Sequence, residues 1–290
     1  MRKFSIFIFL LFLLVFKSES KDLFEKPFVL FVAGRNNIHW YKKNLDSIFS
    51  QQYQNYHVIY IDDYSNDGTG EAIKSYIEKR KLQKKITLIL NDKRKYKMAN
   101  QYDAIHTFCK DSDIVVEIDA DDWFAHKKVL KYLNEIYSDP KIWLTYGKYI
   151  HYPSGSSKNK NSGPVPKKVI HKNNFRKSQW LYTGLRTYYA GLFKLIKKND
   201  LMYKGDKPEF QGKFLPVISD AAIIFPMLEM CGDGHFTYIQ HPLYVLNRSR
   251  DTDYDKEVRK MWKKAAQTLR NMPKYSKLKN LISILVYEAT

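Results

Sequence analysis

The chain of 290 residues is poor in cysteine and lacks two common nucleotide-binding signatures. Its two cysteines, Cys109 and Cys231, give neither a disulfide framework nor a cysteine-based metal site. It contains no G-x-G-x-x-G and no G-x-x-x-x-G-K-[ST] pattern, which argues against a Rossmann dinucleotide site and against a P-loop. Zinc-ligand spacing is also missing among four of the histidines, His151, His171, His235 and His241.

Acidic residues are absent from a long internal stretch. Between Asp139 and Asp200 there is no acidic residue, whereas thirteen Lys or Arg occur there, and the formal net charge of the whole chain is +19. Such a field favours anionic partners, namely phosphate groups, anionic lipid or nucleic acid. The alternative is a Lys-rich surface that reflects a biased composition, because Lys, Asn, Ile and Tyr are all abundant.

Only one strongly apolar run stands at the N-terminus, and it is short for a membrane span. Residues 4–16 contain a single polar side chain, Ser5, and follow Arg2 and Lys3. Ser18 and Ser20 then supply a small-x-small pattern, so residues 1–20 are predicted to be a secretory signal peptide. The protein is therefore expected in the secretory pathway or cell envelope. The alternative is an uncleaved signal anchor that holds it at the membrane, although a span needs roughly 20 residues.

The apolar runs that follow alternate with helical periodicity. Strands are predicted at residues 28–33, 58–61, 86–90 and 114–118, with a helix between each pair. This alternation predicts an α/β fold with a mixed, mostly parallel sheet flanked by helices. Later in the chain we expect strands at 142–146, 236–239 and 243–246, helices at 185–197 and 220–230, and two C-terminal helices.

The fourth predicted strand ends in three carboxylates, Asp119, Asp121 and Asp122. The carboxyl ends of strands in an open α/β sheet are where ligands bind. Adjacent carboxylates repel one another, and a hard divalent cation such as Mg²⁺ or Mn²⁺ would neutralise them. The alternative is a solvated acidic turn.

The second predicted strand also ends in acids, Asp62 and Asp63. A carboxylate there can accept the N–H of a nucleobase. The alternative is an Asx turn with Ser65 and Asn66 before a helix. Both acidic strand ends are expected to face one crevice, because parallel strands end at the same edge of the sheet.

Three motifs in order resemble those of family 2 glycosyltransferases of the GT-A fold. Residues 58–69 carry Asp-Asp-x-Ser-x-Asp-Gly-Thr, residues 118–122 carry the Asp-x-Asp signature, and residues 47–51 carry Ser-Ile-x-x-Gln. The resemblance covers nearly all of residues 28–123 and continues less sharply to Arg248. It implies an inverting transfer from a nucleotide-diphosphate sugar, most simply a UDP-sugar.

The resemblance assigns donor contacts to the first half of the chain. It implies that Asp63 reads the uracil ring with Asp62 beside it, and that Ala33 and Arg35 line the base. Arg35 stands where the family commonly has an aromatic residue, and a guanidinium can also stack on a base. Arg94, from a basic loop, is expected to approach the diphosphate.

The resemblance also assigns the metal and the base. Asp121 and Asp122 are the expected ligands of Mn²⁺ or Mg²⁺, while Asp119 and Asp121 contact the sugar end of the donor. Asp220, at the start of a later helix, is the expected general base. The alternative for Asp220 is a residue that stabilises the helix dipole, with Ser219 as the cap.

These assignments predict a nucleotide-sugar-binding half at residues 27–125 and an acceptor-binding half at residues 126–250, followed by C-terminal helices at 251–290. The acceptor is a glycan, a lipid or a protein, and no nucleic-acid partner is expected. Two other functions remain open at this point. One is a basic protein that binds nucleic acid or a membrane surface without transferase activity, and the other is a nucleotidyltransferase that releases pyrophosphate.

Overall fold

The computed structural model describes residues 24–249 and 256–281. The predicted signal segment at residues 1–20 lies outside these ranges. Within the described part of the chain, no helix combines the length and apolar character that a bilayer crossing requires.

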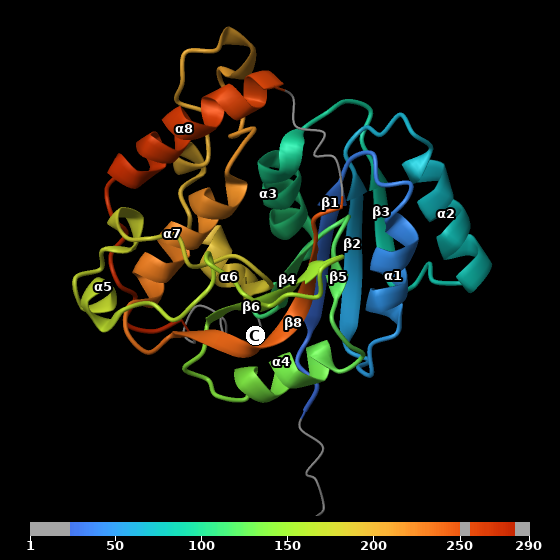
Figure 1. The fold of residues 1–290 in the computed structure, drawn as a ribbon, viewed down its shortest axis with the longest axis horizontal. Coiled ribbons are helices and arrows are strands. Elements are labelled where there is room, and N and C mark those ends of the chain that lie inside the picture. The colour runs from blue at the N-terminus through green and yellow to red at the C-terminus, as the bar shows by residue number, and fades with distance from the viewer. Residues whose placement is uncertain (1–23, 250–255, 282–290) are drawn as a thin grey trace, which may run out of the picture.

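The first half alternates strands and helices as the sequence predicts (Figure 1). Its elements are β1 (Phe28–Gly34), α1 (Tyr41–Phe49), β2 (Tyr56–Asp62), α2 (Thr69–Arg80), β3 (Ile86–Leu90), α3 (Tyr96–Phe108) and β4 (Ile114–Asp119). All four strands are parallel neighbours in the order β3-β2-β1-β4.

The second half completes an eight-stranded sheet, β3-β2-β1-β4-β7-β6-β8-β5. Its elements are β5 (Trp123–Phe124), α4 (Val129–Tyr137), β6 (Leu144–Tyr152), α5 (Lys167–His171), β7 (Arg186–Tyr189), α6 (Ala190–Lys194), α7 (Ser219–Cys231), β8 (Phe236–Asn247) and α8 (Lys256–Asn271). Three short 3-10 helices also occur, η1 (Phe175–Lys177), η2 (Lys198–Asp200) and η3 (Pro208–Phe210). β7 runs antiparallel to both β4 and β6, whereas β6 and β8 are parallel.

Two predictions for the second half need correction. The helix expected at residues 185–197 is wrong at its start, because Arg186–Tyr189 forms the buried strand β7 and only Ala190–Lys194 is helical. Thr187 is β-branched and Tyr188 and Tyr189 are aromatic, which favours a strand. They pair with β4 on one side and β6 on the other. Of the two C-terminal helices, α8 is present. For the second helix predicted within residues 251–290, the described residues 278–281 are not helical, and residues 282–290 lie outside the described ranges.

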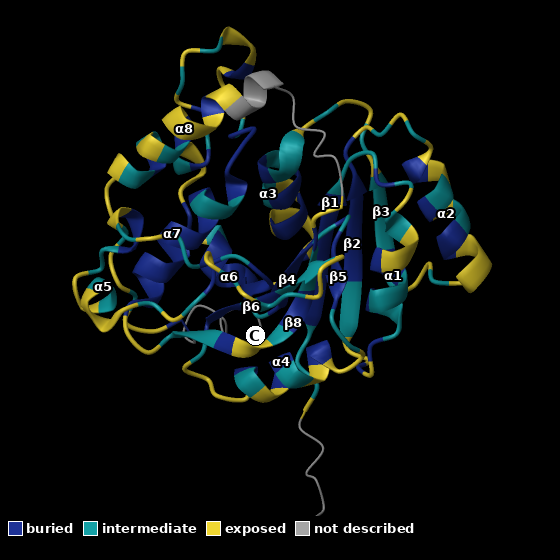
Figure 2. Cartoon of the chain, viewed as in Figure 1, coloured by how far each residue is buried: buried dark blue, intermediate teal, exposed yellow. Residues whose placement is uncertain are grey.

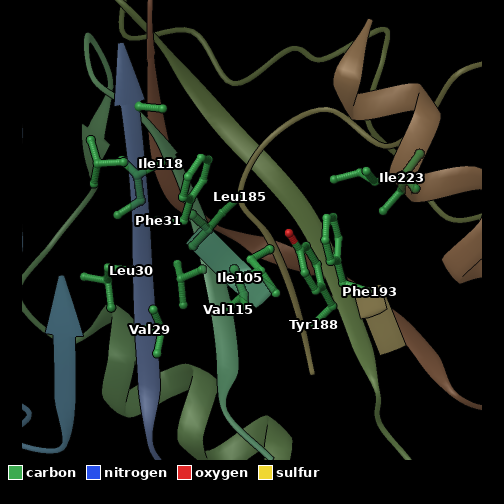
Figure 3. Close-up of a cluster of buried hydrophobic side chains, with 14 of the residues drawn as sticks. Val29, Leu30, Phe31, Ile105, Val115, Ile118, Leu185, Tyr188, Phe193 and Ile223 are labelled. Atoms are coloured by element: carbon green, nitrogen blue, oxygen red, sulfur yellow. The ribbon is translucent and has the colours of Figure 1, made fainter. Parts of the chain in front are cut away.

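Helices cover both faces of the sheet. α1 and α2 pack together on one face, α3, α6 and α7 form a contiguous layer on the other, and α8 packs on α7 (Figure 1). Because both faces are covered, the central strands are almost wholly buried (Figure 2). Side chains of β1, β4 and β7 meet those of α3, α6 and α7 in the core that Figure 3 shows, among them Phe31, Val115, Tyr188, Phe193 and Ile223.

The chain reverses direction across the sheet between β1 and β4. It steps outward from β1 to β2 and β3, then returns to β4 on the other side of β1. The register pairs Ala33 with both Ile61 and Asp119, and pairs Gly34 with Asp62. The two acidic strand ends therefore flank the end of β1, at the switch point where open α/β sheets bind ligands.

Gly34 is required by the close approach of the turn after β4. A Cβ at this position would overlap the Asn37 amide and the Ala120 methyl group. We expect Gly34→Ala to lower the free energy of unfolding by about 1–3 kcal/mol, as overpacking does in a buried site. Urea denaturation followed by circular dichroism measures this.

Gly163→Ala is the matched control, since the nearest atom to a Cβ there is Leu181 Cδ2 at 3.8 Å. Equal effects of the two substitutions would contradict the close approach at Gly34.

Candidate functional site

The acidic turn after β4 is held by hydrogen bonds from an asparagine of α1. Asn44 is fully buried, and its Nδ2 donates to the carbonyl oxygens of Asp119 and Asp122 at 3.2 and 2.7 Å. Both ends of the four-residue turn are thus held by one side chain. Asn44 belongs to α1, the helix in which the Ser-Ile-x-x-Gln motif begins.

Asp122 points away from solvent and is clamped by β8. It is 1% exposed, and its two carboxylate oxygens accept hydrogen bonds from the Tyr244 hydroxyl and the Asn247 backbone N–H, each at 2.7 Å. The Tyr244 hydroxyl also accepts from the Asp119 N–H at 3.1 Å. Burial raises the pKa of Asp122 well above its ordinary value, and the charges of Asp121 and Asp119 raise it further.

Asp119 and Asp121 are the more accessible acids of the turn. The Asp119 carboxylate forms an ion pair with Lys97 Nζ at 2.5 Å, with the Asp119 side chain 39% exposed. Burial lowers the pKa of Lys97, but Asp119 and then Glu117 outweigh it, so the pKa is raised and Lys97 stays charged. Asp121 lies between Asp119 and Asp122 in sequence and is partly exposed.

The chemistry of these carboxylates fits a hard divalent cation. Across residues 24–249 and 256–281, no group of three or more His, Cys, Asp or Glu side chains is arranged as a complete metal site. An ion that takes one or two carboxylates plus substrate phosphates needs no such group. Burial is the largest cause of the raised pKa of Asp122, and the charges of Asp121 and Asp119 add to it. A cation near the turn would offset that added repulsion.

The two acids after β2 make different contacts. Asp62 is buried and accepts from both the hydroxyl and the backbone N–H of Ser65, and burial raises its pKa. Asp63 accepts from the backbone N–H groups of Lys95 and Tyr96 and from Asn91 Nδ2, each at 2.8 Å. Asp63 therefore caps the start of α3, and a contact with the base stays a prediction.

The remaining predicted donor contacts lie around the same edge. Ala33 is the residue of β1 that pairs with Asp119, and it is 8% exposed. Arg35 follows β1 and donates from Nε to the Tyr64 carbonyl at 3.1 Å, next to Asp63. Arg94 lies with its guanidinium 4.4 Å from the centre of the Tyr96 ring. Their contacts with a donor stay predictions.

A buried ion pair beneath the acids connects them to the second half. Arg186 of β7 and Glu117 of β4 are paired at 3.1 Å, and the Tyr188 hydroxyl and Gln101 also donate to Glu117. Burial lowers the pKa of Arg186, but Glu117 more than offsets this and the pKa is raised. Asp220 and Asp119 add to the increase, so both carboxylates lie within electrostatic reach of one guanidinium.

Asp220 lies in the first turn of α7, as predicted. Its Oδ1 accepts from the Ala221 N–H at 2.9 Å, and the side chain is partly exposed. The residue that caps the helix, Ile218, has φ 52° and ψ 33°. A β-branched residue in this left-handed region costs of order 1–3 kcal/mol, and such strain clusters at functional sites.

Sequence reasoning missed three side chains of the site, Asn44, Lys97 and Arg186. Lys97 and Arg186 each stand among apolar or aromatic neighbours, the only signal of burial that the sequence carries. Tyr244 of β8 contacts the acids, as described above. His241, also on β8, lies against His126 with their Nε2 atoms 3.2 Å apart, in a hollow that Tyr132 and Glu135 also line.

Comparison with known proteins agrees with the predicted fold. The family model for glycosyl transferase family 2 matches residues 31–201. A comparison with curated protein sequences gave no match.

Among solved structures, three similar ones contain a nucleotide or a nucleotide sugar. Residues 1–349 of TarS from S. aureus, in complex with UDP-GlcNAc, have a TM-score of 0.57 and 14% identity, covering 79% of this chain and 62% of that one. The mannosyltransferase PcManGT from Pyrobaculum calidifontis, with GDP-Man and Mn²⁺, has a TM-score of 0.53 and 17% identity. The match covers 87% of this chain and 66% of that one. GalNAc-T7 with UDP, GalNAc and Mn²⁺ has a TM-score of 0.51 and 15% identity, and the match covers 78% of this chain and 44% of that one. This chain thus spans less than two thirds of each, and the likeness confirms the GT-A fold.

The clamp on Asp122 generates a stability prediction. Tyr244→Phe removes the hydroxyl that donates to Asp122 and accepts from the Asp119 N–H, leaving the buried Asp122 carboxylate and the partly buried Asp119 N–H without this partner. We expect the free energy of unfolding to fall by about 1–3 kcal/mol in a urea titration. Tyr238→Phe, which removes a hydroxyl elsewhere on β8, is the control. A fall no larger than that of the control would contradict the clamp.

Proposed function

Because this chain belongs to glycosyl transferase family 2, we propose that it moves a sugar from a nucleotide-diphosphate donor to a hydroxyl group of an acceptor, with inversion. Membership in a glycosyltransferase family argues against both alternatives, a basic protein without transferase activity and a nucleotidyltransferase. One observation carries the proposal: the carboxylates of Asp119 and Asp220, from opposite halves of the chain, both raise the pKa of the buried Arg186. This supports an acidic donor site and a carboxylate on a second element within one site.

The proposed donor is a UDP-sugar bound at the ends of β1, β2 and β4. Two of the similar structures contain UDP or UDP-GlcNAc and one contains GDP-Man, which supports a nucleotide sugar as a class. Arg35 lies over the turn after β2, where it can stack on a base. In this proposal Asp62 and Asp63 shape the base site, and Asp63 acts mainly by fixing the start of α3.

We place the divalent metal on Asp121, with Asp119 beside it. Asp122 is the weaker ligand candidate, because both its oxygens already accept hydrogen bonds and it is almost fully buried. Mn²⁺ in two of the similar structures supports a divalent ion. When bound, such an ion supplies Lewis-acid stabilisation for the negative charge on the departing diphosphate. Lys97, already paired with Asp119, contributes a fixed positive charge near the same end, and Arg94 is proposed to approach the diphosphate.

We propose Asp220 as the general base. A carboxylate at this position can accept the proton of the acceptor hydroxyl as that oxygen attacks. The hydroxyl oxygen attacks the anomeric carbon while the bond from that carbon to the diphosphate breaks on the opposite face. Inversion follows from this single displacement. The Ala221 N–H at the start of α7 donates to Asp220 Oδ1 and orients this carboxylate.

The metal proposal predicts the behaviour of Asp121→Asn. This change removes one charge while it keeps the size of the side chain, so we expect Mn²⁺-dependent hydrolysis of UDP-GlcNAc to fall by 10²-fold or more, roughly the loss seen when a charge-stabilising group is removed. Calorimetry of UDP binding should show a matching loss of Mn²⁺ dependence.

Asp103→Asn is the control for that variant, since Asp103 is an exposed acid on α3. Normal Mn²⁺-dependent hydrolysis in the Asp121 variant would rule out Asp121 as a ligand.

The base proposal predicts a different pattern for Asp220→Asn. Donor binding should persist, while the rate of transfer falls by roughly 10²- to 10⁴-fold, the usual contribution of a general base. Asp233→Asn, an exposed acid just after α7, should leave both unchanged. If donor affinity fell as far as the rate, Asp220 would be a structural residue instead.

A further inference from the structure

The pairing of β5 with β8 is short and stops at a proline. β5 pairs through its two residues, Trp123 and Phe124, and the Ala125 N–H adds a hydrogen bond to the Leu243 carbonyl at 3.0 Å. The next residue of β8 along this ladder is Pro242, which has no N–H to donate. Backbone pairing between the two segments therefore cannot continue in the usual way.

Two histidine side chains lie just beyond this point. His126 follows Ala125 directly, His241 precedes Pro242, and their Nε2 atoms are 3.2 Å apart. His126 is half-buried and His241 is exposed, with the ring of Tyr132 from α4 lying 5.7 Å from that of His241. The side chains thus join the two segments where the backbone ladder ends.

β8 carries a bulge at the same place. On either side of the bulge Gly147 pairs with Ile239 and Tyr149 with Tyr244, so residues 240–243 stand opposite a single residue of β6. Bulges re-aim side chains and are common next to active sites. This bulge sets the position of Tyr244, whose hydroxyl contacts the acidic turn.

The hydrogen bonds around His126 decide which ring nitrogen carries its proton. The Lys128 backbone N–H donates to His126 Nδ1 at 3.2 Å, so Nδ1 is unprotonated. In a neutral ring the proton is then on Nε2, which donates to Nε2 of His241. A metal ion between the two rings would need both Nε2 atoms unprotonated, which this arrangement does not provide.

Protonation of either ring is incompatible with these contacts. A charged His126 places an N–H against the Lys128 N–H, and a charged His241 places an N–H against that of His126. The pair therefore requires two neutral rings. Histidine gains its charge in the range just below neutral pH, so acidification breaks the pair.

The surroundings of the pair also favour neutral rings. The charged side chains around it are Lys128, Lys131 and Glu135, which line the hollow, and Lys148 of β6, opposite the bulge. Burial lowers the pKa of His126 from its ordinary value of 6.5, and His241 and Lys128 lower it further. An opened ring takes up a proton first as the pH falls, so the stability that the pair contributes is lost progressively below about pH 6.5.

We propose that the His126–His241 pair is a pH-sensitive latch on the pairing of β5 with β8. When both rings are neutral the latch holds the bulge of β8, and acidification opens it. The far end of the same pairing is the clamp on Asp122, made by the Tyr244 hydroxyl and the Asn247 N–H. Opening the latch therefore loosens the acidic turn. The effect on donor binding rests on the proposed function, whereas the latch itself does not.

The first test locates the ring protons. Long-range proton–nitrogen NMR spectra of the full chain report which ring nitrogen is protonated, and His126→Gln and His241→Gln assign the signals. At pH 8 we expect the proton of His126 on Nε2 and that of His241 on Nδ1. A proton on Nδ1 of His126 would overturn the proposal.

The second test measures hydrogen exchange of the Ala125 amide, which donates beside the latch. At pH 5.5 an opened ring with a pKa of about 6.5 is protonated roughly tenfold over its neutral form. The protection factor of Ala125 should therefore fall roughly three- to tenfold between pH 7.5 and 5.5.

Two variants at the latch change this fall in different ways. His126→Gln should remove most of it, because a Gln amide can donate to a neutral His241 or accept from a charged one. His241→Ala should lower the protection of Ala125 already at pH 7.5. His57→Gln is the matched control, since His57 is also half-buried with a lowered pKa but lies on β2, and it should keep the fall.

The third test connects the latch to the acidic turn. Between pH 7.5 and 5.5 the affinity for UDP with Mn²⁺ should fall at least threefold more in the unsubstituted chain and in His57→Gln than in His126→Gln. Titration of the acids of the turn contributes equally in all three proteins, so it does not produce this difference.

The outcomes separate the latch from the proposed function. Equal pH dependence of Ala125 protection in the unsubstituted chain and His126→Gln, or full protection in His241→Ala, would overturn the latch. Equal pH dependence of UDP affinity in all three proteins would overturn its connection to the acidic turn. If UDP bound to none of them while Ala125 protection changed as expected, the proposed function would fail and the latch would stand.

Discussion

The candidate site depends on one buried carboxylate. Asp122 accepts a hydroxyl and a backbone N–H from β8, a strand more than 120 residues further along the chain. Together with Asn44 from α1, this clamp fixes a turn that carries two more acids. Without it, repulsion among three neighbouring carboxylates would open the turn toward solvent. Asp122 is a buried acid whose pKa is raised, and its hydrogen bonds hold Asp119 and Asp121 at the switch point.

Burial also decides which charges can meet across the two halves. Glu117 and Arg186 are satisfied by each other, by Gln101 and by Tyr188, so the pair is tolerated inside the sheet. Removing either partner would leave a buried charge unpaired, which is far costlier than never having the pair. The pair sits between β4 and β7, so it also fixes the second half against the first. Asp119 of β4 and Asp220 at the start of α7 both raise the pKa of this Arg186.

The first half and its acidic strand ends are predictable from the sequence, because β2 and β4 are apolar runs that stop abruptly at aspartates. The family and the fold follow from the same motifs and are confirmed. Which acid of the turn is buried, and which is accessible, is not predictable from the sequence. Asp121 and Asp122 are neighbours of the same type, and the contacts of Asp122 with Tyr244 and Asn247 of β8 distinguish the buried one. Strand β7 escapes prediction for a similar reason, since its polar members are matched by partners on β4 and β6.

Half of the clamp on Asp122 is made by backbone. At position 247 only the N–H is used, so any residue except proline can supply it, whereas position 244 needs a phenolic hydroxyl. This hydrogen bond therefore places no demand on the side chain at position 247. The Asn247 side chain has a separate role, since its Oδ1 accepts from the N–H and the hydroxyl of Ser249. The hydrogen bond from position 247 to Asp122 thus depends on strand register rather than on residue identity.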